Sequence, residues 1–555
     1  MKKIIALILT AVLLIYAFSG CSLLEKVIGE IGIVDMGPTS PKVDGSENPH
    51  LNYTLNQELV DSFYQILEES ETLAIAGEDA DQVDALTEQL DEVYTELIDQ
   101  YQIAYVHYCL DQSDEAMKSR YLDCVDIVTE AESAYNEMCK RVYLSETPLR
   151  DMLFEDWTEE EIAMLLAYNE EIAQLEKRNT EITVEFRELD MYADSWDRDV
   201  IPLYNEMVRN NNRIAEIYGY RNYYEYAYQN VYQRDYDMTQ IGKLRQYAAE
   251  YLPTVCQEAT KAFEEVYENL SDEDSRELSF YVYNDYDQLS SNYVKSYIAD
   301  MPESSQEMMR DMFDRDRAIF INYGESYQGA FTTWIDGEPF CFFGQDYSNS
   351  ETVIHEMGHY YGSMYVEPWS QPMDLSETQS QSNEWLFVDY LESQMSSDLY
   401  CALSEYKLSS DIGYIICFVM IDEFEEKVYS QENAGNLSLE EYDAIMEEIA
   451  EAYGGLTFIQ ENILDIQSYW KQVVLESPVY YVSYAVSGIA AINLYTMAQQ
   501  DEAAARECFR KLMEEPVEDE GFLVNIQNAG FSGPFDEEVY RQLMYRYTGF
   551  PGEII

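Results

Sequence analysis

His355 and His359 lie four residues apart in the segment HEMGH. On a helix this spacing places both imidazoles on one face, one turn apart, where they can bind a single metal ion. Glu356 then lies beside them and can accept a proton from a water that the metal activates, before passing it to a leaving amine. The pattern therefore predicts a catalytic zinc site with two histidine ligands and a glutamate general base.

A third protein ligand is needed, because a catalytic zinc ion usually has three protein ligands and one open position. The chain has only four histidines, and the other two, His50 and His107, lie far upstream. A carboxylate is therefore the better expectation. Glu377 and Glu384 are seven residues apart and share one face of a predicted helix. From the residues alone these two and Glu367 remain alternatives, and so does an acidic surface helix without a ligand.

Two short strands are predicted just before the histidines. Residues 329–335 and 339–344 are rich in aromatic and β-branched side chains, and Asp336-Gly337 between them is typical of a tight hairpin turn. No other segment shows a convincing strand pattern. We therefore expect one small sheet beside the helix that contains the histidines.

Most of the remaining chain predicts amphipathic helices. Apolar residues recur at three- and four-residue spacing in long acidic segments such as 57–76, 81–110 and 159–192, and the same periodicity continues from residue 350 almost to the end. The 50 tyrosines supply much of the large apolar area. A mainly α fold is therefore expected.

The pattern of the first 21 residues predicts that the protein is exported from the cytoplasm. Two lysines precede the apolar stretch Ile4–Phe18, which is too short to span a membrane, and Ser-Gly-Cys follows, ending at Cys21. This resembles a bacterial lipobox, which implies a signal peptide over residues 1–20, lipid attachment to Cys21 and a tether over residues 21–51. Phe18 is unusual in a lipobox, and an ordinary signal peptide or an uncleaved anchor is the alternative. In each case we expect the protein outside the cytoplasm, and the lipobox implies that its lipid attaches it to the bacterial cell membrane.

The charge argues against nucleic-acid binding. There are 107 acidic residues against 33 basic ones, which gives a formal net charge of -74. Such a surface repels phosphate backbones. The acidity indicates mainly a solvated surface, with attraction of basic substrates as the alternative.

The cysteines show no CxxC spacing, so a zinc site built from thiolates is not expected.

The histidine segment and the residues after it resemble the oligoendopeptidase F and thimet oligopeptidase group of zinc peptidases. In that group HExGH is followed by a helix with the pattern ExxSxxxE, and residues 377–384, ETQSQSNE, match it. The resemblance covers roughly residue 324 to the C-terminus. It implies that Glu377 is the third zinc ligand, with one zinc ion per chain. It also implies that Glu384 orients a ligand without touching the metal.

The resemblance further implies a two-lobed gluzincin fold, in which the lobes face each other across a channel that excludes folded proteins. Residues 52–240 would form the N-terminal helical lobe and residues 241–555 the catalytic domain. Gly329, Ala330 and Phe331 match a strand that binds the substrate peptide in the family. An edge strand can hold a peptide by its backbone without reading its sequence.

Residues 477–484 resemble the tyrosine loop of the family, whose hydroxyls donate hydrogen bonds to the oxyanion. Tyr481 and Tyr484 are the candidates for this role. One position departs from the family pattern, because Val473 stands where relatives have a histidine that stabilises the transition state. Losing one oxyanion donor costs about a hundred- to a thousandfold in rate.

We therefore expect a monomeric, extracytoplasmic zinc endopeptidase that cleaves short unfolded peptides. The alternative is a lipoprotein of the same fold that binds peptides and has lost efficient catalysis. Val473 favours this alternative. The intact Glu356 argues against it, since a protein that only binds peptides needs no general base.

Overall fold

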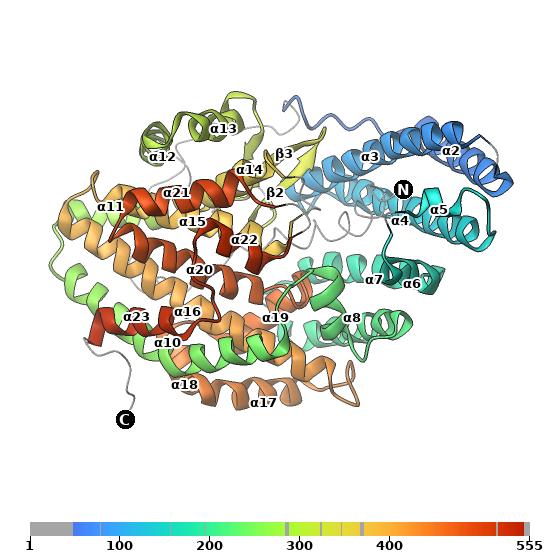
Figure 1. The fold of residues 1–555 in the computed structure, drawn as a ribbon. Coiled ribbons are helices and arrows are strands. Elements are labelled where there is room, and N and C mark those ends of the chain that lie inside the picture. The colour runs from blue at the N-terminus through green and yellow to red at the C-terminus, as the bar shows by residue number, and fades with distance from the viewer. Residues whose placement is uncertain are drawn as a thin grey trace.

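Helices make up most of the protein, and one three-stranded sheet lies among them, as the computed structural model in Figure 1 shows. The predicted mainly α fold with a small sheet is confirmed. The described residues are 48–77, 79–155, 157–191, 193, 195–283, 288–321, 325–345, 347–366, 371–517 and 520–548. Cys21, the predicted signal peptide and almost all of the predicted tether lie outside these residues.

The helices before the sheet form two sets in Figure 1, with α2 to α8 on one side and α10 to α13 extending into the larger part of the molecule. Their bounds are α2 (Gln57–Ala76), α3 (Ala80–Leu110), α4 (Glu115–Leu144), α5 (Arg150–Leu153), α6 (Glu159–Ala167), α7 (Glu170–Arg187), α8 (Trp196–Tyr218), α9 (Tyr223–Tyr226), the π-helical turn η2 (Ala227–Val231), α10 (Met238–Tyr267), α11 (Asp272–Tyr283), α12 (Gln288–Asp300) and α13 (Glu303–Asp314).

The helices after the sheet build the larger part of the molecule. Their bounds are α14 (Ser350–Ser363), α15 (Met373–Leu391), α16 (Ser397–Tyr429), α17 (Leu439–Ala450), the 3₁₀ turn η4 (Glu451–Tyr453), α18 (Leu456–Asn462), α19 (Ile466–Glu476), α20 (Val482–Ala498), α21 (Glu502–Glu514), α22 (Phe522–Ala529) and α23 (Glu537–Thr548).

Sequence periodicity located the first long helices correctly and missed one break. The predicted helices over 57–76 and 81–110 match α2 and α3. The single helix expected over 159–192 is wrong, because α6 ends at Ala167 and α7 begins at Glu170. Asn169 between them has an extended backbone, and its side chain accepts a hydrogen bond from the Glu171 amide. Such an N-cap starts a new helix without interrupting the apolar spacing on either side.

The larger part is organised around α15, which packs between α14 and α20, while α10 runs along α16. One buried apolar cluster extends from Leu51 in the first segment to Met544 in the last helix. The predicted lobe boundary at residue 240 falls in the first turn of α10. It stays a prediction.

The sheet consists of β1 (Ala318–Phe320), β2 (Ala330–Ile335) and β3 (Glu338–Phe343), in the order β1-β3-β2. The predicted hairpin is confirmed, because β2 and β3 pair antiparallel and both turn residues, Asp336 and Gly337, have positive φ. β1 pairs parallel with β3 and was not predicted, since three residues are too few for a strand pattern. Among the described strands, β2 is an edge strand.

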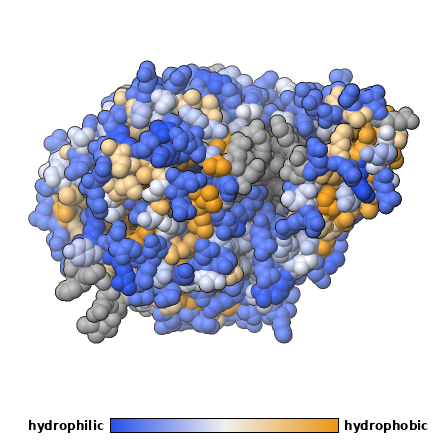
Figure 2. Space-filling view, in the orientation of Figure 1, coloured by the Kyte–Doolittle hydropathy of each residue, from blue (hydrophilic) through white to orange (hydrophobic). Residues whose placement is uncertain are grey.

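The surface of the protein is mainly hydrophilic on one face. Hydrophilic residues cover most of the face shown in Figure 2, with apolar residues in small groups between them. Within the described part of the chain, no helix has both the length and the apolar composition needed to cross a membrane.

Candidate active site

Helix α14 brings the two histidines and Glu356 together in the interior. Asn349 caps its start by accepting a hydrogen bond from the Thr352 amide, and every residue from Thr352 to Ser363 is buried. His355, Glu356 and His359 therefore lie on a helix enclosed on all sides, whereas a surface helix would expose one face. Glu356 is 1% exposed.

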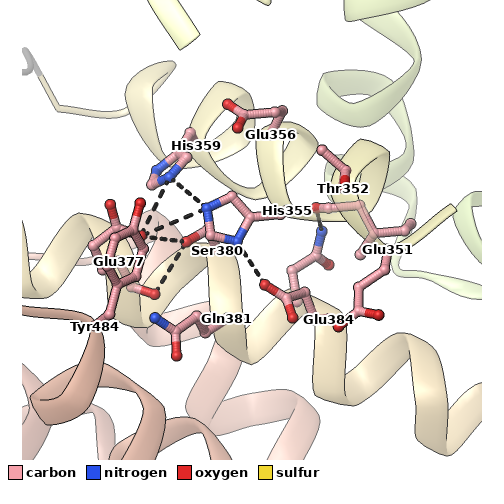
Figure 3. A network of polar contacts seen from close by, with 12 residues as sticks. Glu351, Thr352, His355, Glu356, His359, Glu377, Ser380, Gln381, Glu384 and Tyr484 are labelled. Atoms are coloured by element: carbon pink, nitrogen blue, oxygen red, sulfur yellow. Dashed lines mark hydrogen bonds and ion pairs between the residues drawn. The ribbon is translucent and has the colours of Figure 1, made fainter. Parts of the chain in front are cut away.

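Three donor atoms converge at this point. The Nε2 atoms of His355 and His359 are 3.1 Å apart, and each is 3.6 Å from Oε2 of Glu377 on α15 (Figure 3). Donors about 2.0–2.1 Å from one ion at tetrahedral angles would be about 3.3 to 3.4 Å apart. The geometry therefore fits a small divalent cation such as zinc, with two imidazoles and one carboxylate as its protein ligands.

The other ring nitrogens of both histidines have partners that leave Nε2 available to a metal. Nδ1 of His355 lies 2.5 Å from Oε1 of Glu384, and Nδ1 of His359 lies 3.0 Å from the Ser376 hydroxyl. A carboxylate can only accept, so His355 holds its proton on Nδ1. Burial, and then the neighbouring His355, lower the pKa of His359 well below its usual value, which favours the neutral imidazole that binds metals.

A close crossing of two helices allows Glu377 to reach the histidines. A Cβ atom at Gly358 on α14 would lie 2.6 Å from Cα of Ser380 on α15. One turn later, a Cβ atom at Gly362 would overlap the side-chain amide of Gln379. Only glycine permits this approach of the two backbones. The glycine of HExGH is therefore a packing requirement of the candidate metal site.

Glu377 is fully buried and held by hydrogen bonds on both sides. Burial raises the pKa of its carboxyl to about 7, although the charge of His355 and hydrogen bonds from Tyr480 and Ser380 act in the opposite direction. Tyr480 donates to Oε1, and Ser380 donates to Oε2 at 3.3 Å. Oε2 is the oxygen that faces the histidines, and a bound cation would favour the ionised form.

Glu384 belongs to a second layer of charged groups behind His355. Its Oε2 accepts a hydrogen bond from Lys407 at 2.6 Å, and Lys407 also contacts Glu351 at 2.5 Å and Asp411 at 3.2 Å. Burial opposes ionisation of Glu384, but Lys407 and His355 outweigh it and lower its pKa. Glu384 contacts Nδ1 of His355 rather than the metal-facing nitrogen, so it is placed to orient the imidazole.

Glu356 is placed as a base that can change its protonation near neutral pH. Figure 3 shows it above the two imidazoles in this view. Its Oε2 accepts a hydrogen bond of 2.7 Å from the Thr332 hydroxyl on β2. Burial raises the pKa of Glu356 to about 7, against the lowering effects of His355 and Thr332. A pKa near the working pH suits a group that must accept and release a proton.

The tyrosine loop between α19 and α20 contributes a residue that sequence reasoning missed. Tyr480 bonds Glu377 directly. Tyr481 and Tyr484 both pack against the Tyr480 ring, at centroid distances of 5.5 and 5.2 Å, and both pack against Phe418, at 5.6 and 5.5 Å. Both predicted hydroxyl donors therefore contact the tyrosine that bonds Glu377, and these contacts do not distinguish between them. In a chain with 50 tyrosines, no local pattern distinguishes Tyr480.

The loop is fixed in a strained conformation. Val479 has a φ of 64°, a left-handed conformation that is costly for a β-branched residue. Its amide donates to both carboxylate oxygens of Glu425 at 2.9 Å. Arg234, which precedes α10, donates to the carbonyls of Val479 and Tyr480 and to the Ser483 hydroxyl, at 2.9, 3.2 and 2.9 Å. These buried charged groups hold the backbone that positions Tyr480.

In the predicted substrate strand, the side chains are buried and the main chain is the part that can bind a peptide. Ala330 and Phe331 are buried, and Phe331 packs against Tyr105 of α3 at a centroid distance of 5.2 Å. A Cβ atom at Gly329 would lie 2.6 Å from the Tyr327 ring. With its side chains facing inward on an edge strand, this segment is suited to hold a peptide by main-chain hydrogen bonds. This role stays a prediction.

The two other histidines of the chain have partners away from this site. His50 contacts the Arg315 carbonyl, and Nδ1 of His107 lies 3.1 Å from Arg120. Val473 is buried in α19. Glu367, the other alternative for the third ligand, lies outside the described residues.

Comparison with known proteins shows the fold. No family model matches the sequence, and no curated protein sequence matches it. Solved structures do match over nearly the whole chain. A protein described as an oligoendopeptidase F from Bacillus anthracis has 17% sequence identity and a TM-score of 0.67, with 90% of this chain and 96% of that chain covered.

Two further structures agree. PZ peptidase A, solved with an inhibitor, has 16% identity and a TM-score of 0.68, covering 91% of this chain and 98% of that chain. Oligoendopeptidase F from Enterococcus faecium has 13% identity and a TM-score of 0.55, covering 89% and 97%. At these identities the likeness establishes the fold alone. The chain therefore has the oligoendopeptidase F fold, and the resemblance found in its sequence is confirmed at that level.

Proposed function

We propose that this protein is a zinc-dependent endopeptidase that hydrolyses short unfolded peptides outside the cytoplasm. The observation that supports this most strongly is the convergence of three buried donors, from His355, His359 and Glu377, at mutual distances of 3.1 to 3.6 Å. Glu356 lies on the same helix, between the two histidines in sequence. The proteins that share the fold are named as peptidases, which supports the same reaction class.

The zinc ion, when bound, would lower the pKa of a water molecule and polarise the scissile carbonyl. Glu356 accepts the proton that the attacking water loses as its oxygen bonds to the carbonyl carbon. The same carboxyl then gives this proton to the amide nitrogen as the carbon–nitrogen bond breaks. The products are a new carboxylic acid, which releases the second water proton as it ionises, and a new amine, and Glu356 returns to its starting form.

The chain's other residues bind and orient the substrate in this proposal. The backbone of Gly329, Ala330 and Phe331 holds the peptide in an extended form beside the metal site. The hydroxyls of Tyr481 and Tyr484 are the candidate donors to the developing oxyanion.

The location is part of the proposal. Cys21 would carry the lipid that anchors the protein to the membrane, with the peptidase body held outside the cytoplasm as a monomer. Each chain would bind one zinc ion. Short peptides are the proposed substrates, and the acidic surface makes nucleic acid an unsuitable partner.

A peptide-binding lipoprotein without efficient catalysis is the rival proposal. Val473, in place of the histidine found in relatives, is the feature that favours it. The buried Glu356, with its pKa near 7, favours the enzyme.

The test uses the full chain in detergent with a library of quenched fluorescent peptides, and measures the zinc content. Glu356→Gln is the matched control, because it keeps the shape of the side chain and removes its basicity. Turnover that disappears in the control while zinc stays near one per chain supports the enzyme. Bound zinc without turnover supports the rival, and Val473→His then tests whether the missing histidine is the cause.

A further inference from the structure

The predicted general base is held by a residue of the predicted substrate strand. Oγ1 of Thr332 donates a hydrogen bond of 2.7 Å to Oε2 of Glu356, and both side chains are buried. The same hydroxyl lies 3.5 Å from the Glu356 carbonyl oxygen. Cys341, which pairs with Thr332 across the hairpin, has its Sγ 3.8 Å from that carbonyl. Two facing residues of β2 and β3 therefore contact Glu356.

The alternation of the strand makes this contact specific to Thr332. Successive side chains of a strand point to opposite faces. Thr333, the next residue, is also buried and donates to Oε1 of Gln102 on α3, likewise at 2.7 Å. Phe331, on the same face as Thr333, packs against Tyr105 of α3. Thr332 is thus directed at α14, while its neighbours face the first helices.

A hydroxyl in this position restricts the Glu356 carboxylate. The group is almost completely buried, so no bulk water competes for its oxygens. With Oε2 bonded to Thr332, the rotation of the carboxylate is limited and Oε1 is left for proton transfer. Reaction rates depend steeply on such placement, and a misplacement of about 1 Å can cost about a hundredfold.

We propose that Thr332 is a positioning residue that fixes the orientation of Glu356, so that one strand places both the peptide and the base. This rests on the proposed function, in which Glu356 is the base and residues 329–331 hold the substrate. Because Thr332 follows Phe331 directly, any shift of the strand would move the peptide and the carboxylate together. Their relative position is then set by one rigid element.

The test compares Thr332→Val with Thr333→Val in the full chain. Both substitutions keep the shape of a buried threonine and remove a side-chain hydrogen bond of 2.7 Å, and Thr332→Val also removes the longer contacts of that hydroxyl with Cys341 Sγ at 3.3 Å and the Glu356 carbonyl at 3.5 Å. For Thr332→Val we expect kcat to fall by about ten- to a hundredfold, with KM and zinc content unchanged. Thr333→Val should lower the melting temperature by about as much as Thr332→Val does, but leave kcat unchanged. Thr332→Ser, which restores the hydroxyl, should recover most of kcat.

Equal losses of kcat in the two valine variants would show a general structural effect and overturn the proposal. An unchanged kcat in Thr332→Val, or no recovery in Thr332→Ser, would also overturn it. Two further measurements separate failure of the positioning role from failure of the proposed function. They are the turnover of the wild type and crystal structures of the zinc-loaded wild type and Thr332→Val. If the wild type lacks turnover, the proposed function fails. A Glu356 carboxylate that keeps its position without Thr332 overturns the positioning role itself, whereas a displaced one supports it.

Discussion

The Tyr480 hydroxyl donates a hydrogen bond to Oε1 of Glu377, while Oε2 of the same carboxylate faces the two histidines. The tyrosine loop is thereby connected directly to the metal site. Outer groups of this kind fix the orientation of a ligand, and their loss typically lowers metal affinity by about ten- to a hundredfold. We therefore expect the loop to have a structural role at the candidate metal site in addition to the catalytic role proposed for it.

Replacement of Tyr480 by phenylalanine tests this connection. We expect zinc affinity, measured by competition with a chelating dye, to fall by about ten- to a hundredfold. Tyr540→Phe is the matched control, because it removes a buried hydroxyl that donates to the Pro534 carbonyl at 2.8 Å, in another part of the chain. Equal zinc affinity in both variants would contradict the role of Tyr480.

Replacement of Gly358 by alanine tests the close crossing of α14 and α15. The new Cβ atom would lie 2.6 Å from Cα of Ser380, so the helices must separate and the donors on them must move apart. We expect loss of zinc binding, and a fall of about 1 to 3 kcal/mol in the free energy of unfolding. Gly242→Ala on α10, where nothing lies within 4 Å, should keep zinc and raise the free energy of unfolding by about 0.5 to 1 kcal/mol. Zinc bound normally by Gly358→Ala would show that the crossing can relax.

A pair of buried carboxyls far from the metal predicts a pH effect on stability. Burial, and then the charge of Glu176, raise the pKa of Glu132 on α4 well above its usual value near 4.5. Burial likewise raises the pKa of Glu176 on α7 to about 7. In both cases the folded state binds the proton more tightly than the unfolded state. Each contribution to stability is therefore complete below about pH 4.5; that of Glu176 is lost as the pH rises through 7, and that of Glu132 as the pH rises through its own raised pKa.

Glu132→Gln should consequently be more stable than the wild type at pH 8, by about 1 to 2 kcal/mol, with a smaller difference at pH 5. Urea unfolding at both pH values measures this. Glu130→Gln, an exposed residue on the same helix, should show no such pH-dependent difference. A Glu132→Gln variant that is less stable than the wild type at pH 8 would contradict the raised pKa.

Zinc should stabilise the folded protein, because its three predicted ligands converge only after folding. At a free zinc concentration of a hundred times Kd we expect about 2.7 kcal/mol of added stability. Thermal unfolding with zinc, and after removal of zinc by a chelator, measures the effect. His359→Ala should abolish the dependence on zinc. A melting temperature that zinc leaves unchanged in the wild type would count against a metal site at these residues.

Local features of the fold could be predicted well. The spacing of apolar residues located α2 and α3, and the turn Asp336-Gly337 located the hairpin, because periodicity and turn chemistry act over a few neighbouring residues. The break between α6 and α7 was missed, since apolar spacing does not report a cap such as Asn169. β1 was missed because its three residues are too few to show a strand pattern, and its parallel pairing with β3 is not local in the sequence.

By itself, the sequence determined the acidic, mainly helical character of the protein and the placement of His355, Glu356 and His359 on one helix. These follow from composition and from the 3.6-residue period of a single helix. Only the tertiary structure decided that Glu377 faces both histidines while Glu384 contacts the opposite nitrogen of one. The reason is physical: a residue on another element reaches the site only through packing, and the packing of α14 on α15 has no pattern in either helix alone.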